Sequence, residues 1–158
     1  MRPSSLFGLG LLVAALAGCN PFRQPVRVNQ DTNYNARWHG TLTSPSYLAG
    51  AVQITGTASM APGTDGRKTK VMVEVTNAAP GGLHPWEMHI GQCGADQGIF
   101  GPMDEYQPLK IGTDGRGTAS AEIPMPTPSY GNYFVLLHAS TANRETIVAC
   151  GNMAPPAP

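Results

Sequence analysis

The sequence predicts an all-β domain, an antiparallel sandwich or flattened barrel, on three observations. Charged residues make up only 13% of the 158 residues, while the chain holds 19 Gly and 15 Pro. That composition favours many short strands and turns over long surface helices. Strand-like stretches recur at short intervals from about residue 51 to residue 150, and no segment of helix length has a convincing 3.6-residue period. The length allows one domain with a core of normal size.

The clearest predicted strands form a hairpin. Residues 51–58 and 70–76 both alternate, with Val71, Val73 and Val75 on one face, and residues 61–66 supply the turn. Further strands are predicted at 86–90, 117–123, 133–139 and 146–150. Turns are predicted at 80–82, 114–115 and 129–131, where Gly, Pro, Asp and Ser gather.

The N-terminus has the features of a bacterial lipoprotein signal. Arg2 precedes an apolar run that is too short to span a bilayer as a helix, and Leu-Ala-Gly leads into Cys19. We expect residues 1–18 to be removed and Cys19 to be lipidated, which anchors the chain to a membrane. Because Asn20, rather than Asp, follows the cysteine, we expect the outer membrane, facing the periplasm. The alternative is an ordinary signal peptide with a chance cysteine.

The remaining chain divides into three predicted segments. Residues 19–36 form the lipidated N-terminus and a tether, 37–152 the β-domain, and 153–158 a Pro-rich tail. The 10 basic and 10 acidic residues give zero formal net charge. That balance argues against a nucleic-acid partner, which needs a basic face.

The cysteine count predicts one disulfide. Of three cysteines, lipidation takes Cys19 and leaves Cys93 and Cys150 as an even pair in an exported protein. The chain-entropy model assigns a crosslink of this span about 4 kcal/mol of stabilisation.

Two strands carry histidines beside residues that suit a metal ion. Period-two geometry puts Glu87 and His89 on one face, and Trp86, Met88 and Ile90 on the other. On the second strand His138 shares a face with Phe134 and Leu136, and both faces of that strand are apolar. A covered histidine there needs a hydrogen-bond partner or a metal ion.

These runs resemble the copper/zinc superoxide dismutases. Gly82-Leu83-His84, Glu87, His89, Gly91 and Cys93 are similar to that family's copper-ligand strand and first disulfide cysteine. Leu137-His138-Ala139 resembles the strand with the last copper histidine, and Ala149-Cys150-Gly151 the second cysteine. The resemblance covers most of residues 50–151. It implies an eight-stranded Greek-key β-barrel for the predicted domain, with His89 and His138 as copper ligands on its outer surface.

The chain departs from the family at several positions. The first copper histidine is replaced by Glu87, and residues 94–115, where the bridging histidine and zinc ligands belong, contain no histidine. The guiding arginine is replaced by Ile147, with Arg144 three residues away. The resemblance therefore implies a lost zinc site, and we assign no catalytic residue.

The candidate metal ligands are His89, His138, Glu87 and His84. The first three form a two-histidine, one-carboxylate set suited to one copper ion, or zinc as the alternative. His84 is a possible fourth ligand, although it matches a structural histidine of the family. The competing interpretation is that the histidines are hydrogen-bonded remnants and that Glu87 is a salt-bridged or solvent-facing carboxylate.

Three functions are compatible with the sequence. The first is a lipid-anchored envelope protein whose dismutase-like domain holds at most one copper ion. The second is a working copper-only dismutase, and the third is a structural or partner-binding envelope module. The sequence identifies no protein partner.

Overall fold

The computed structural model describes residues 37–50 and 53–157. The predicted signal peptide, Cys19 and the tether up to residue 36 lie outside the described residues. The described part contains ten strands and two short 3-10 turns, η2 (Ser46–Leu48) and η3 (Met103–Glu105). The strands are β1 (Trp38–Thr43), β2 (Thr55–Pro62), β3 (Thr69–Thr76), β4 (Leu83–His84), β5 (Trp86–Gln92), β6 (Ala95–Ile99), β7 (Leu109–Lys110), β8 (Gly117–Ile123), β9 (Tyr133–His138) and β10 (Ile147–Ala154).

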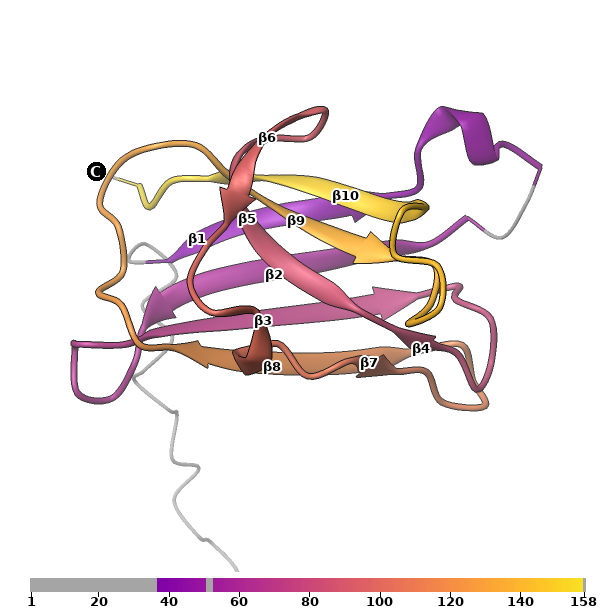
Figure 1. Cartoon of the computed structure of the whole chain (residues 1–158), viewed down its shortest axis with the longest axis horizontal. Helices are drawn as coiled ribbons and strands as arrows, with labels where there is room; N and C mark the ends of the chain where they lie inside the picture. The colour runs from indigo at the N-terminus through magenta and orange to yellow at the C-terminus, as the bar shows by residue number, and fades with distance from the viewer. Residues whose placement is uncertain (1–36, 51–52, 158) are drawn as a thin grey trace, which may run out of the picture. The chain divides into compact units, whose positions relative to one another are not determined.

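Eight strands form one antiparallel sheet in the order β6-β5-β9-β10-β1-β2-β3-β8. The chain therefore crosses from β3 to β5 and from β8 to β9, between distant places in the sheet (Figure 1). Such crossings are typical of Greek-key connections. A two-stranded sheet of β4 and β7 lies beside β8, where a side chain at Gly117 would meet the carbonyl oxygen of Lys110 at 2.6 Å. The predicted all-β fold is confirmed.

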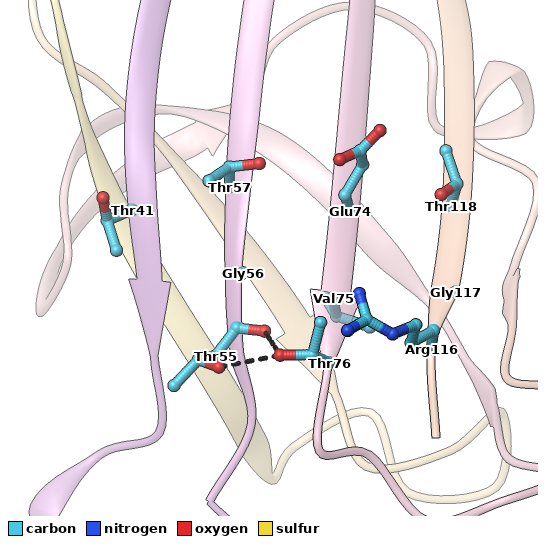
Figure 2. Close-up of a pocket in the computed structure, with 10 residues that line it drawn as sticks. All are labelled: Thr41, Thr55, Gly56, Thr57, Glu74, Val75, Thr76, Arg116, Gly117 and Thr118. Atoms are coloured by element: carbon cyan, nitrogen blue, oxygen red, sulfur yellow. Dashed lines mark hydrogen bonds between the residues drawn. The ribbon is translucent and has the colours of Figure 1, made fainter. Parts of the chain in front are cut away.

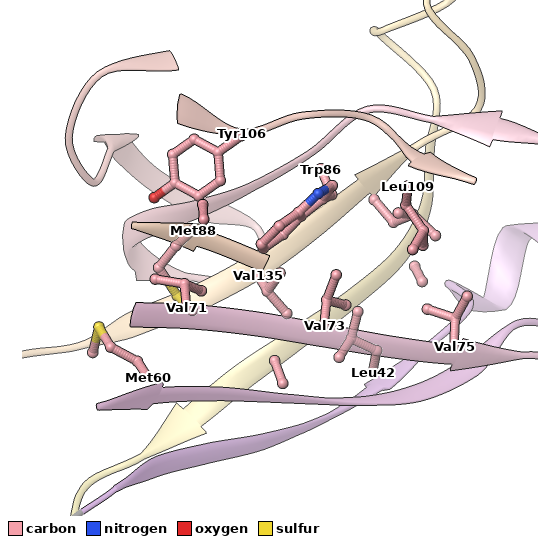
Figure 3. Close-up of a cluster of buried hydrophobic side chains, with 14 of the residues drawn as sticks. Leu42, Met60, Val71, Val73, Val75, Trp86, Met88, Tyr106, Leu109 and Val135 are labelled. Atoms are coloured by element: carbon pink, nitrogen blue, oxygen red, sulfur yellow. The ribbon is translucent and has the colours of Figure 1, made fainter. Parts of the chain in front are cut away.

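The core lies inside the curl of the large sheet. The alternating pattern of β3 buries Val71, Val73 and Val75, as predicted. Figure 3 shows Trp86 and Met88 of β5 facing these valines from the other half of the sheet. Each fully buried aliphatic or aromatic side chain contributes about 2 kcal/mol of transfer free energy. The curl therefore brings the two strand sets together around a single core.

The structure corrects one prediction for β5. Period-two geometry puts Ile90 on the face of Trp86 and Met88, which are buried, but Ile90 is 37% exposed. The pairing of β5 with β6 is irregular between His89 and Gly91, and Gly91 has a φ of +110°. A side chain at Gly91 would meet the carbonyl oxygen of Ala95 at 2.3 Å. A β-bulge at a glycine bends a strand in this way and re-aims its side chains.

The predicted disulfide joins Cys93 to Cys150, with Cα atoms 6.1 Å apart. It ties the segment after β5 to the middle of β10. The backbone N–H of Cys93 also donates to the Asn152 side chain at 2.8 Å. Among the described residues there is no helix whose length and hydropathy would let it cross a membrane.

Candidate functional site

The candidate ligands lie on one face of β5 and β9. In the pairing of β5 with β9, His89 is opposite Phe134 and Glu87 is opposite Leu136. The backbone N–H of His138 donates to the carbonyl oxygen of Pro85. Glu87 therefore lies between the two histidines along this face. We call Glu87, His89 and His138 the histidine face. All three side chains are largely covered, which differs from an open strand surface.

His89 is oriented by a carboxylate from β6. Its Nδ1 lies 2.9 Å from Oδ1 of Asp96, and because a carboxylate only accepts, Nδ1 carries the proton. In the neutral ring, Nε2 then has the lone pair, and this buried atom has no hydrogen-bond partner among the described residues. Histidines that ligate metals usually donate their other nitrogen in this way.

Asp96 is itself well solvated. Its side chain is 50% exposed, and its Oδ1 also accepts from the backbone N–H of Gly98 at 2.8 Å. Partial burial acts to raise the pKa of Asp96, but the Gly98 bond and the bond and charge of His89 outweigh it. The pKa of this carboxyl is therefore below its ordinary value, which favours the charged form that accepts from His89.

Glu87 and His138 form the other pair of the face. The Nε2 of His138 lies 2.9 Å from Oε2 of Glu87, so Nε2 carries the proton and Nδ1 is left without a partner among the described residues. The second oxygen of Glu87, Oε1, accepts from Nη2 of Arg144. Glu87 is only 2% exposed, and each of its oxygens has a partner, one in His138 and one in Arg144.

Arg144 reaches Glu87 from the loop between β9 and β10. The loop is closed by a backbone bond from Ala139 to Thr146 at 2.8 Å and by a turn between Ser140 and Asn143. Its arginine side chain remains 43% exposed. Arg144 therefore binds a buried carboxylate while nearly half of its own side chain is exposed to solvent.

His84 is directed elsewhere. Its Nδ1 donates to the carbonyl oxygen of His138 at 2.9 Å and so links β4 to β9. Its Nε2 is buried without a partner among the described residues and points toward Gly82, where a Cβ would stand only 2.6 Å from it. Gly82 therefore makes room for this ring, and the ring joins strands of the two sheets.

The arrangement does not fit a metal ion as it stands. Within residues 37–50 and 53–157, no three or more His, Cys, Asp and Glu side chains are grouped to hold one. The oxygen that a metal would take from Glu87 is bound to a guanidinium, and the Nε2 of His138 donates to the same carboxylate. His89 and His138 each keep one buried ring nitrogen without a partner among the described residues, but the carboxylate beside His138 is already paired with Arg144.

Sequence reasoning missed two members of this site. Asp96 lies in the region where the family's zinc ligands belong and was not among the candidate ligands, yet it orients His89. Arg144 was noted only as a displaced guiding arginine, yet it neutralises Glu87. The buried carboxylate on an apolar strand was the available signal, because such a charge needs a cation nearby.

Two of the surface depressions contain none of the three side chains of the histidine face. One, about 430 Å³, lies on the outer surface of the sheet (Figure 2). Its lining residues, none of them a predicted site residue, are Thr41, Thr55, Gly56, Thr57, Glu74, Val75, Thr76, Arg116, Gly117 and Thr118. The other, about 680 Å³, lies beside the disulfide and includes Tyr47 and Leu136.

Comparison with known proteins gives one kind of match. No protein-family model matches the chain, and no curated protein does. Among solved structures, the chain is similar to a double mutant of a SOD-like protein from Bacillus subtilis. That match has a TM-score of 0.49 and 14% identity, and it covers 72% of this chain and 95% of the other.

Proposed function

We propose that this protein is a lipid-anchored protein of the bacterial envelope whose dismutase-like domain has lost the zinc site. In this proposal the domain binds at most one copper ion and does not catalyse superoxide dismutation. The observation that carries the proposal is the buried pair of Glu87 with Arg144. It lies at the position where the sequence resemblance expects the first copper histidine.

Chemistry supports the loss of catalysis. Dismutation cycles one copper ion between two oxidation states, and imidazole ligands suit both of them better than a carboxylate does. A carboxylate that is already paired with a guanidinium is a poorer ligand still, because a metal ion would have to displace that cation. The zero net charge of the chain also offers no overall attraction for an anion such as superoxide.

A copper titration of the mature, oxidised protein in detergent tests this proposal. Electron paramagnetic resonance counts the bound Cu(II), and a dismutation assay with excess chelator suppresses the activity of free copper. We expect no more than one copper per chain and no activity above the buffer control. Two metals per chain, or activity that disappears in His89→Ala and His138→Ala, would contradict the proposal.

A copper-only dismutase is the second candidate. The observation that favours it is His89, whose Nδ1 is held by Asp96 and whose Nε2 has no partner within the described structure. The dismutation assay separates the two candidates, because both allow one bound copper ion but only the working dismutase has activity that is lost in His89→Ala and His138→Ala. If copper binds only adventitiously, a metal-independent envelope module becomes the better account.

The anchor is tested separately. We expect Cys19 to incorporate labelled palmitate in a bacterial host and the protein to fractionate with outer membranes. Cys19→Ser should abolish the label and release the chain from the membrane fraction, whereas Cys93→Ser should leave the label in place. Labelling that survives Cys19→Ser would contradict the anchoring.

A further inference from the structure

We infer that the groove beside the disulfide binds one ring of a neutral sugar. Its volume of about 680 Å³ lies within the range of about 300–1,000 Å³ that is common for ligand pockets. The lining includes none of the three side chains of the histidine face. The inference therefore goes beyond the proposed function and does not depend on whether a metal ion binds.

The groove lies over the middle of the large sheet. Its lining residues come from β1, β9 and β10, from the loop that contains η2, and from the turn that follows β5. Each of these three strands has a neighbour on both sides. The groove therefore offers no free strand edge with which the backbone of an extended peptide could pair, and recognition depends on side chains.

Tyr47 presents an aromatic surface that is exposed and yet held in place. Its side chain is 67% exposed. Its hydroxyl donates to the backbone carbonyl oxygen of Ile147, 100 residues along the chain, at 2.7 Å. The loop is also held by Ser44, whose hydroxyl donates to the carbonyl oxygen of Val148 at 2.7 Å. Because the ring is ordered before a ligand arrives, little side-chain freedom is lost when it stacks against one.

The lining is uncharged. Among the described residues that form it, none is Asp, Glu, Lys, Arg or His. An ionised ligand would lose hydration in this groove without gaining a partner of opposite charge. The groove therefore favours a neutral ligand.

The uncharged lining combines apolar and hydrogen-bonding groups. Leu136 is buried and Ile147 is half-buried, and both provide apolar surface. Thr41 and Thr43 are exposed and contribute hydroxyls. The Oδ1 of Asn152 accepts from the backbone N–H of Cys93 at 2.8 Å, so its Nδ2 is directed away from that bond as a donor.

A sugar ring has both kinds of surface, with C–H groups on its faces and hydroxyls around its rim. The apolar body of Tyr47 suits the C–H face. The two threonine hydroxyls and the Asn152 amide supply partners for the ligand hydroxyls. A purely apolar ligand would instead cover these polar groups without pairing them, which costs free energy.

Calorimetric titration of the mature, oxidised protein with two neutral trisaccharides, triacetylchitotriose and cellotriose, tests the inference. The detergent must lack a sugar headgroup. We expect saturable one-to-one binding of at least one of them, and no binding of trigalacturonate, whose rings carry carboxylates. Tyr47→Ala should weaken binding at least about tenfold, because the stacking surface is lost. Tyr130→Ala is the matched control, since Tyr130 is 84% exposed and does not line the groove, and it should leave the affinity unchanged.

A second pair of variants covers the case in which Tyr47→Ala disturbs the loop. Thr43→Arg puts a long charged side chain into the groove from an exposed position of β1 and should abolish binding. Thr118→Arg, exposed on β8 and outside the groove, should not change it. The inference is overturned if neither neutral sugar binds or if trigalacturonate binds as tightly. Unchanged affinity in folded Tyr47→Ala and Thr43→Arg also overturns it. Each of these results leaves the copper and dismutation outcomes, and so the proposed function, untouched.

Discussion

The two histidines of the histidine face each donate to a carboxylate, but the two carboxylates differ in burial. Both rings donate to a carboxylate oxygen at 2.9 Å, His89 to Asp96 and His138 to Glu87. The carboxylate differs in exposure, since Asp96 is 50% exposed and Glu87 is 2% exposed. Water solvates the first carboxylate, whereas the second depends on a protein cation.

The two ends of the face therefore differ in the surroundings of the carboxylate rather than in the histidine ring. At both ends the second ring nitrogen, Nε2 of His89 and Nδ1 of His138, is buried without a partner in the described structure, but at the His89 end the carboxylate is half exposed to water. At the His138 end the buried charge draws in Arg144, and a closed ion pair results. The burial of the carboxylate therefore decides which end has a protein cation beside it.

The largest expected effect on stability comes from the disulfide, which lies near the His89 end of the face. Cys93 follows His89 by four residues, and its bond to Cys150 closes a span of 57 residues. Replacing both cysteines by serine should lower the free energy of unfolding by about 4 kcal/mol in the chain-entropy model. Urea unfolding by fluorescence measures the change. A loss below about 1 kcal/mol would show that the crosslink does not restrain the unfolded chain as described.

The second largest effect on stability is expected at the His138 end, for the replacement of Arg144. Arg144→Gln leaves a buried carboxylate with one partner fewer, and we expect a loss of about 2 kcal/mol of stability in metal-free buffer. The value is below that of a fully buried pair because the arginine is partly exposed. Arg67→Gln is the matched control and should cost less than about 0.5 kcal/mol, because both members of its pair are exposed. Equal losses in the two variants would remove the distinction between the two ends.

The smallest change in the free energy of unfolding is expected for Asp96→Asn. Because this carboxylate is half exposed, its bond to His89 should contribute less than about 1 kcal/mol. The folded-state pKa of Asp96 lies below its ordinary value of 3.8, so the contribution is present above that pH. It is lost as the pH falls through the lower folded-state value. Urea unfolding of both proteins at neutral pH and below pH 3.8 checks this, and a difference that persists at low pH would contradict it.

The fold could be predicted because its determinants are local in the sequence. Alternation in β3 marks the buried valines, and the cysteine count leaves one pair for the disulfide. The exposure of Ile90 could not be predicted, since it depends on how β6 pairs across the bulge at Gly91. The bond from Arg144 to Glu87 also escaped prediction. It joins residues 57 positions apart through a loop that has no periodic pattern.

The central claim is that Arg144 and Glu87 form one energetic unit at the first copper position. A double-mutant cycle of Arg144→Gln and Glu87→Gln, with unfolding free energies measured in metal-free buffer, tests it most directly. We predict a coupling energy of about 2 kcal/mol, since each single change breaks the same buried pair. Losses that add to within about 0.3 kcal/mol would mean that the two side chains act independently and would contradict the account.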